Sequence, residues 1–225
     1  MKQVTGSNPS RSVMKVSIRL ASDGHSFSIS GDGAVAAAAE EVEVELLTAC
    51  SLLVPAALCA EGDGARLLAA AGMPVRSGDE VVCTPPTAGD DPLRAVMALP
   101  RDAAEALCGR LGIAMPPRTA AGEGASSPGI PGVRFASPLL HEVAGPEKCV
   151  WIRPAGELLY IKVCDGRLRL AEVFSVPSVD DALCLLDRLA GVFPLSDLPL
   201  LLAGAEGEKW RKTMKRYFKQ IVCES

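Results

Sequence analysis

Aromatic residues are scarce in this chain. Phe, Trp and Tyr make up 4% of the 225 residues, while apolar residues make up 48% and charged residues 22%. That composition is typical of a soluble globular chain and not of a disordered one. With so few aromatic side chains, the sequence predicts a core built mainly of alanine, valine and leucine.

Long apolar runs and a strong positive charge are also missing. The longest apolar stretches, such as AVAAAA at 34–39 and LPLLLAGA at 198–205, are much shorter than the roughly 20 residues that cross a bilayer. No apolar segment of a signal peptide follows the basic N-terminal residues. We therefore expect a cytoplasmic protein without a transmembrane segment. A formal net charge of −4 and a pI near 5.3 give no overall attraction to nucleic acid.

Closely spaced cysteine pairs are absent. There are eight cysteines, and no two of them form a C-x-x-C pair. Structural zinc sites need such pairs, because two ligands then come from one turn of the chain. Apolar neighbours, as in EALCGRL and DALCLLD, are typical of cysteines buried as small hydrophobic residues. We expect reduced, structural thiols and no metal site.

Signatures of catalysis are missing as well. Only two histidines occur, His25 and His141, and no nucleophile signature accompanies either. GEGASSPG contains glycines but no lysine that could reach a phosphate. The sequence therefore predicts no catalytic residue. His25 follows a turn, and SPLLHEVAG predicts a short helix capped by Ser137 with Pro138 at its first position.

What is present is a set of short strands and helices in two halves. Asp-Gly pairs at 23–24 and 32–33 predict tight turns between antiparallel strands that open the first half. VEVELL at 42–47 either extends this sheet or begins another strand. The predicted strands are 13–20, 25–30, 34–42, 80–86 and 93–100, the helices are 64–72 and 101–112, and a mobile loop spans 116–132.

The second half repeats this opening. WIRPAGELLYIKVCDGRLR at 151–169 has nearly the glycine spacing of the first hairpins. Ser178 and Asp181 predict a capping box at the start of a helix. The remaining predicted elements are strands at 149–153, 157–163, 167–175 and 198–204 and a final helix at 206–222. The predicted order is β-β-β-α-β-α.

This order and the stretches SIRLASDGHSFSIS, VFSVPSVDDALCLLDRL and PLLLAGAEGEKWRKTMKRYF resemble a bacterial family of domains of unknown function. That family has the duplicated RNase H-like fold of actin, sugar kinases and the large heat-shock chaperones. The resemblance implies an α/β fold with two RNase H-like halves, each opening with three antiparallel strands followed by helix, strand and helix. It implies a first half at 13–115, a flexible loop and connecting helix at 116–148, and a second half at 149–225.

In that superfamily an Asp-x-Gly loop in the first hairpin of each half approaches the nucleotide phosphates and Mg²⁺, because glycine allows close backbone approach and carboxylate holds the metal's waters. The resemblance places these loops at 22–24 and 154–156, where Ser22 and Pro154 replace the aspartate. Asp23 lies one position late, where an ordinary turn is expected. The adenosine loop corresponds to LLLAGAEG, which keeps Gly204 but has alanine at the next position.

These matches give a set of candidate nucleotide-binding residues. They are Ser22, Asp23, Gly24, Ser26, Gly156 and Gly204. We expect no cofactor, although the fold leaves Mg-ATP open. Because the metal-holding carboxylates are missing, we expect a degenerate fold that does not catalyse phosphate chemistry.

The one pronounced charge feature is EKWRKTMKRYFK at 208–219. It predicts a helix with an aromatic stripe, which we expect to pack on the second sheet, and a basic, solvated face. The basic residues are Lys209, Arg211, Lys212, Lys215, Arg216 and Lys219, and the stripe is Trp210, Met214, Tyr217, Phe218 and Ile221.

The sequence leaves three functions open. The first is a non-catalytic interaction, scaffold or ligand-binding protein with an unknown protein partner, and this is the function that the missing carboxylates favour. The second is a nucleotide-dependent kinase or ATPase whose metal ligands lie elsewhere. The third is a nucleic-acid or membrane-surface binder that uses the basic C-terminal helix.

Overall fold

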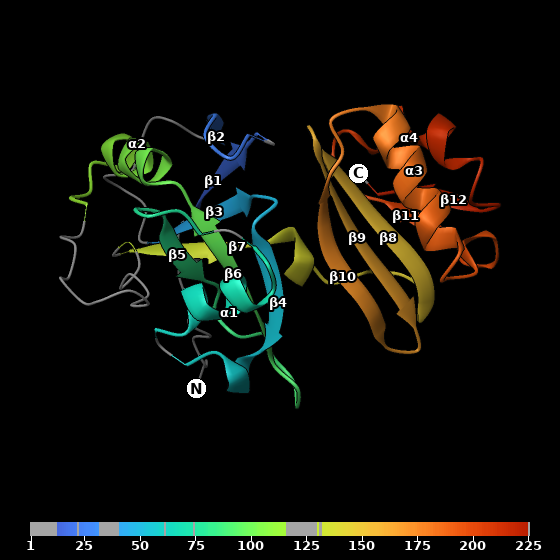
Figure 1. Ribbon diagram of the computed structural model, residues 1–225, viewed down its shortest axis with the longest axis horizontal. Helices are drawn as coiled ribbons and strands as arrows, with labels where there is room; N and C mark the ends of the chain where they lie inside the picture. Colours follow the sequence, from blue (N-terminus) through green and yellow to red (C-terminus); the bar gives the residue numbers. More distant parts are fainter. Residues whose placement is uncertain are drawn as a thin grey trace, which may run out of the picture.

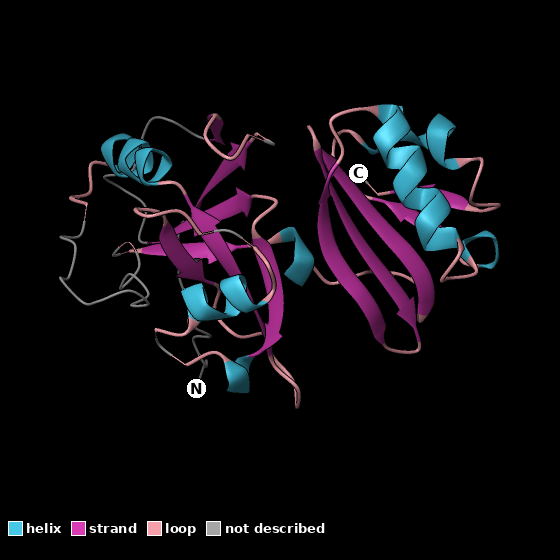
Figure 2. Ribbon diagram, in the orientation of Figure 1, coloured by secondary structure: helices cyan, strands magenta, loops and turns pink. Residues whose placement is uncertain are grey.

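Three β-sheets and four α-helices form the described part of the computed structural model (Figures 1 and 2). The described residues are 13–21, 23–31, 41–60, 62–73, 75–115, 130 and 132–224. Within these ranges, no helix combines the length and the apolar character needed to cross a lipid bilayer. Most of the predicted loop at 116–132 lies outside the described residues.

Sheet A has the strand order β2-β1-β3-β7. It consists of β1 (Val13–Leu20), β2 (Phe27–Gly31), β3 (Glu41–Leu47) and β7 (Val133–Ala136). Apolar residues alternate with polar ones along β1 and β3, so one face of the sheet is buried and the other is polar. β1 pairs antiparallel with β2 but parallel with β3, and β3 pairs parallel with β7.

The predicted third strand at 34–42 is described only at its last two residues, and these begin β3, which runs parallel to β1. Residues 34–40 of the predicted third strand lie outside the described residues. VEVELL extends sheet A, one of the two alternatives that the sequence left open, as a strand parallel to β1. β7 also lies in the segment predicted as loop and connecting helix, so that segment contributes a strand to sheet A.

Sheet B lies between sheet A and a short helix. It consists of β4 (Ser51–Pro55), β5 (Glu80–Cys83) and β6 (Leu93–Leu99), all antiparallel, in the order β4-β6-β5. One face packs under α1 (Gly64–Ala70), next to the 3-10 turn η2 (Ala56–Leu58). The other face shares a core with sheet A and α2 (Arg101–Leu111), which ends at Gly112 with φ 67°, as predicted. The strands predicted at 80–86 and 93–100 therefore both form between α1 and α2, whereas the helix-strand-helix order implied by the resemblance has only one strand there.

Sheet C has the order β10-β9-β8-β11-β12. Its strands are β8 (Lys148–Ala155), β9 (Leu158–Asp165), β10 (Leu168–Ser175), β11 (Leu200–Leu202) and β12 (Ile221–Cys223). β8, β9 and β10 are antiparallel, and β11 and β12 continue in parallel. The helices α3 (Val179–Ala190) and α4 (Gly207–Met214) cover its outer face (Figure 1). The predicted capping box of Ser178 and Asp181 starts α3.

The predicted final helix at 206–222 is too long. α4 ends at Met214, and the chain turns and adds β12 beside β11. The apolar stripe continues past the helix because the turn buries Tyr217 and Phe218 against the same core. Ile221 then lies opposite Leu200 in the sheet. The packing of the stripe on sheet C is confirmed, but Lys215, Arg216 and Lys219 lie outside the helix.

A third hydrophobic core lies between the part of the chain that carries sheets A and B, called the first half, and the part that carries sheet C, called the second half. The inner face of sheet C, with Trp151 and Tyr160 fully buried, packs on Leu47 at the end of β3 and on Leu139. Leu139 belongs to the 3-10 turn η3 (Pro138–Leu140), whose first turn is capped by the Ser137 side chain as predicted. The two halves are therefore held together by apolar packing.

Candidate functional site

The first predicted phosphate loop, between β1 and β2, is closed by its own side chains. The Asp23 carboxylate accepts hydrogen bonds from the N–H groups of His25 (2.7 Å) and Ser26 (2.8 Å) and from the Ser26 hydroxyl (2.7 Å). The hydroxyl bond, followed by the two backbone bonds, lowers the pKa of Asp23 to about 2. Asp23 thus stabilises a turn that passes through Gly24 at φ 66°. Ser22 lies outside the described residues.

Arg76, in the segment between α1 and β5, covers this turn. Its guanidinium donates to the carbonyl oxygens of Gly24 (2.8 Å) and Asp23 (2.9 Å), and Nη1 lies 2.9 Å from Nδ1 of His25. An arginine nitrogen can only donate, so Nδ1 of His25 accepts. His25 therefore connects the turn to the segment that leads into sheet B.

Glu206 fills the second predicted phosphate loop. Its carboxylate accepts the N–H of Gly156, with the Gly156 nitrogen 3.1 Å from Oε1 and 3.3 Å from Oε2. Nη1 of Arg19, near the end of β1, lies 3.2 Å from Glu206 Oε1. The Gly156 N–H, in the loop that the resemblance places near the phosphates, is therefore bound to a carboxylate of the chain. An arginine from the first half compensates the charge of that carboxylate.

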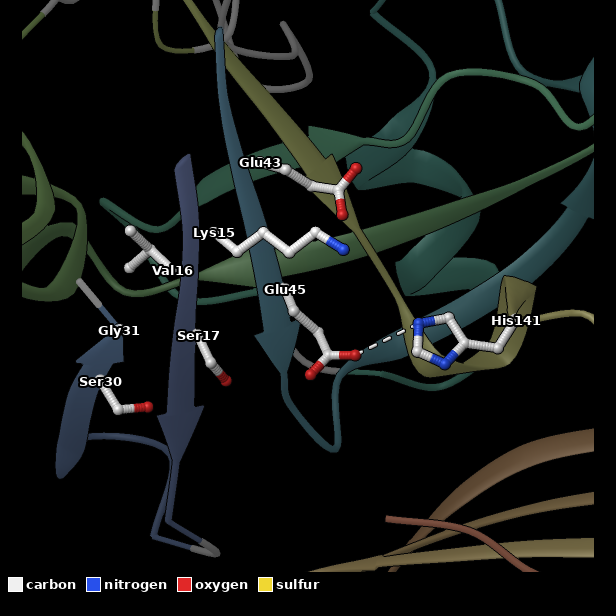
Figure 3. Close-up of a pocket in the computed structure, with 8 residues that line it drawn as sticks. All are labelled: Lys15, Val16, Ser17, Ser30, Gly31, Glu43, Glu45 and His141. Atoms are coloured by element: carbon white, nitrogen blue, oxygen red, sulfur yellow. Dashed lines mark ion pairs between the residues drawn. The ribbon is translucent and has the colours of Figure 1, made fainter. Parts of the chain in front are cut away.

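Glu45 and Arg153 form a second ionic contact between the halves. Arg153 Nη1 and Nη2 each lie 2.6 Å from an oxygen of the Glu45 carboxylate. His141 Nε2 lies 3.3 Å from Glu45 Oε1 (Figure 3), and its Nδ1 lies 3.3 Å from Arg153 Nη1. Burial alone would raise the pKa of Glu45, but the bonds from His141 and Arg153 outweigh it and lower the pKa to about 2. We call Arg19, Glu45, His141, Arg153 and Glu206 the interhalf cluster.

Arginine side chains lie against all three candidate glycines. A Cβ atom added to any of them would come within 3.2–3.3 Å of a guanidinium or its last methylene. The pairs are Gly24 with Arg76, Gly156 with Arg19, and Gly204 with Arg153. The space beside these glycines is therefore occupied by the chain's own side chains.

A pocket of about 240 Å³ opens on the polar face of sheet A, next to the interhalf cluster (Figure 3). The strand register places Ser17 opposite both Ser30 and Glu45. Glu45 lies between Ser17 and the His141 ring (Figure 3). A serine nucleophile needs the base beside it, so this order does not form a catalytic triad. The pocket is lined by Lys15, Val16, Ser17, Ser30, Gly31, Glu43, Glu45 and His141.

A buried lysine lies behind the cluster. Lys162 of β9 is 3% exposed, its Nζ lies 4.4 Å from the centroid of the Trp151 ring, and it donates a hydrogen bond to the carbonyl oxygen of His141. Burial, with a smaller effect of the Arg153 charge, lowers the pKa of Lys162 to about 8. Beside it, Tyr160 Oη accepts the N–H of Thr48 at 2.8 Å. The Lys162 bond therefore ties the backbone at His141 to sheet C, and the Tyr160 bond ties the residue after β3 to the same sheet.

The predicted basic residues lie on the surface around α4. Arg211 pairs with Glu208 (3.4 Å) and Lys219 with Asp197 (3.3 Å). Lys209, Lys212, Lys215 and Arg216 are also exposed. The structure does not bring these side chains together with the interhalf cluster.

Sequence reasoning missed the acidic and basic members of the interhalf cluster. Glu45 and Arg153 are 108 residues apart in the chain, and no motif links them. The available signal was the alternation in VEVELL, which places Glu43 and Glu45 on one face of a strand. In the part of the chain that the structure describes, no group of three or more His, Cys, Asp or Glu side chains is arranged to hold a metal ion.

Comparisons with known proteins identify the fold. No protein-family model matches the chain, and no curated protein does. A Bacteroides thetaiotaomicron protein with an actin-like ATPase fold and unknown function has 16% sequence identity and a TM-score of 0.60, covering 94% of this chain and 90% of that one. The cytoplasmic domain of EpsL, an inner membrane component of the Vibrio cholerae type II secretion system, has 12% identity and a TM-score of 0.37, covering 84% and 80%.

Proposed function

We propose that this chain, which has an actin-like ATPase fold, is a non-catalytic interaction or scaffold protein whose nucleotide position is filled by its own side chains. One observation carries the proposal: Glu206 accepts the Gly156 N–H while Arg19 pairs with the same carboxylate. A phosphate would have to compete with this carboxylate for the same donor. Phosphoryl transfer also depends on Mg²⁺ placement, and Ser22 and Pro154 offer no carboxylate for it.

The duplicated architecture is part of this proposal. Sheets A and C share an antiparallel hairpin followed by two parallel strands, β2-β1-β3-β7 in one and β9-β8-β11-β12 in the other. Both hairpin turns pass through a glycine with positive φ, Gly24 at 66° and Gly156 at 64°. A shared strand order with a glycine at the same turn is the pattern that duplication would leave.

The core between the halves supports a scaffold role. Trp151 and Tyr160 are buried between sheet C and the first half, and the charged groups around them are paired across the same interface. Apolar packing with paired charges favours one fixed arrangement of the halves. A fixed arrangement suits a protein that presents a surface to a protein partner in the cytoplasm.

Thermal unfolding with and without millimolar Mg-ATP tests the expectation that the chain does not bind the nucleotide. A ligand at 100 times its Kd adds about 2.7 kcal/mol of stability, which would raise the melting midpoint by roughly 5–10 °C in a chain of this size. We expect no shift for the wild type, because Glu206 occupies the Gly156 N–H. A shift of that size would contradict the proposal and favour the kinase or ATPase alternative.

Two variants test whether Glu206 is the cause. Glu206→Ala frees the Gly156 N–H, so binding of inorganic phosphate or ATP that appears only in this variant would identify the carboxylate as the block. Glu208→Ala removes a nearby exposed carboxylate, which contacts Arg211 at 3.4 Å and the Cys223 thiol and does not contact Gly156. This control should behave as the wild type does.

A second function is favoured by the exposed basic residues on α4 and directly after it. Such a surface binds anionic lipid or RNA through charge, with strong salt dependence. If this is the function, reversing Lys212, Lys215 and Arg216 to glutamate should abolish binding to anionic vesicles or to RNA. Flotation and filter binding measure the two cases. Unchanged association in the triple variant would rule this surface out.

A further inference from the structure

A pair of thiols lies under α1, in the core of sheet B and away from the interhalf cluster. Sγ of Cys59 and Sγ of Cys83 are 3.8 Å apart. Cys59 follows η2 and is 6% exposed, whereas Cys83 ends β5 and is half-buried. Both belong to the small core that includes Leu68 of α1. No disulfide links any of the eight cysteines, all of which lie in described ranges.

We propose that Cys59 and Cys83 form a redox-responsive dithiol site that a low-molecular-weight disulfide converts to a protein disulfide. The half-buried Cys83 attacks the small disulfide and releases one small thiol, leaving a mixed disulfide. Cys59 then attacks the Cys83 sulfur and releases the second small thiol. The two cysteine protons end on the two released thiols, and the small disulfide takes up two electrons. This inference is independent of the nucleotide position.

The geometry suits a bond between these two cysteines. A disulfide requires sulfurs about 2.05 Å apart, so the two sulfurs at 3.8 Å must approach by less than about 2 Å. Cys59 lies at the end of a short 3-10 turn and Cys83 at the end of a strand, where the backbone is not held on both sides by a sheet. The bond would close the segment that contains α1 across the face of sheet B.

The surroundings determine how fast and how strongly the site responds. Burial, then the neighbouring Cys59 thiol, raises the pKa of Cys83 to about 12. Since the thiolate is the nucleophile, oxidation is slow at neutral pH and accelerates as the pH rises. Sheet B with α1 is a small structural unit with a small core. A cross-link that closes the loop from Cys59 to Cys83 should therefore stabilise it measurably.

The test uses the full chain with Cys184→Ser and Cys223→Ser, which removes the two exposed thiols, those most accessible to intermolecular bonds. The protein is incubated with oxidised glutathione, unfolded, alkylated and mapped by mass spectrometry. We expect loss of two alkylated thiols, a peptide joined through Cys59 and Cys83, and a melting midpoint raised by roughly 5–10 °C. Dithiothreitol should reverse all three changes.

Matched variants separate the pair from its surroundings. Cys83→Ser should abolish the joined peptide and the midpoint shift, while Cys50→Ser, in the same core, should retain both. The number of alkylated thiols in the chain that keeps Cys59 and Cys83 tests the proposal even if Cys83→Ser fails to fold. Full alkylation after oxidation, or a disulfide that maps to another pair such as Cys149 and Cys164, would overturn the proposal.

Discussion

Replacing Arg153 with alanine is expected to lower the free energy of unfolding by about 3 kcal/mol. Arg153 holds both oxygens of Glu45 at 2.6 Å, and the two side chains are only 18% and 21% exposed. Removing the guanidinium leaves the carboxylate half-enclosed at the interface between the halves with only His141 as partner. Urea unfolding measured by far-UV circular dichroism gives the change in stability.

The control for this variant is Arg134→Ala, in β7 of the sheet that carries Glu45. Arg134 pairs with Glu43 at 2.6 Å, but its side chain is 49% exposed, and an exposed pair contributes at most about 1 kcal/mol. Glu45→Gln combined with Arg153→Ala should be little less stable than Arg153→Ala alone, because the two groups act as one pair. Additive losses in the double variant would contradict the assignment of Glu45 and Arg153 as a unit.

The same pair predicts a pH dependence. The pKa of Glu45 is 4.5 when unperturbed and about 2 in the folded chain. The unfolded state therefore binds more protons between these values, so the contribution of Glu45 is complete above pH 4.5 and is lost as the pH falls to about 2. The shift corresponds to roughly 3 kcal/mol. We expect this part of the acid destabilisation to disappear in Glu45→Gln.

Local signals account for the elements that the sequence predicted. The alternation of β1, the glycine stop of α2 at Gly112 and the capping box of Ser178 and Asp181 each depend on residues a few positions apart. Such signals do not depend on tertiary contacts, so they can be recognised in a single sequence. The actin-like ATPase fold was implied by the resemblance of their order and of three stretches to a known family, and the structural comparison confirms the fold.

Pairings between distant segments could not be predicted in the same way. The direction of β3 against β1 depends on how the chain between them returns, and no residue of VEVELL encodes it. β12 forms because β11 leaves a free edge for Ile221 to pair with, although the apolar spacing up to this residue fits a helix equally well. Tertiary context therefore decided both cases.

The candidate site shows the same division. The glycines at 24, 156 and 204 became candidates because the resemblance places them in nucleotide-binding loops, and each has a positive φ. Their arginine neighbours come from other strands and loops. The sequence contains no signal that distinguishes these arginines from the others as neighbours of the glycines. Glu206 was visible only as a neighbour of Gly204, and its contact with Gly156 depends on the docking of α4 against β8.

Replacing Lys162 with methionine is expected to change the pH dependence of stability. The pKa of Lys162 is about 8 in the folded chain and 10.5 when unperturbed, so between these values the unfolded state binds more protons. Stability of the wild type therefore gains a contribution as the pH rises from 8 to 10.5, and the shift corresponds to roughly 3 kcal/mol. Methionine has nearly the same length and does not titrate.

The measured quantity is the free energy of unfolding of Lys162→Met minus that of the wild type. It should fall by roughly 3 kcal/mol between pH 7 and pH 10.5, with the variant at least as stable as the wild type at pH 7. The loss of the contact with Trp151 and of the bond to the His141 carbonyl reduces the gain at pH 7 but is the smaller effect.

Taking the difference between two chains isolates Lys162 from the other groups that titrate in this range. Burial raises the pKa of Tyr160 and of several thiols, which destabilises both chains alike at high pH.

Lys148→Met is the matched control, because its exposed ammonium pairs with Asp165 at 2.8 Å, which raises the pKa of Lys148. A group whose pKa is raised by folding stabilises the folded chain below its unfolded pKa and loses this effect as the pH rises. The free energy of unfolding of Lys148→Met minus that of the wild type should therefore not fall between pH 7 and pH 10.5. The contrary result is a difference in the free energy of unfolding between Lys162→Met and the wild type that stays constant from pH 7 to 10.5. It would mean that the Lys162 ammonium between Trp151 and His141 is not desolvated. The two halves would then be less tightly joined there than their contacts indicate.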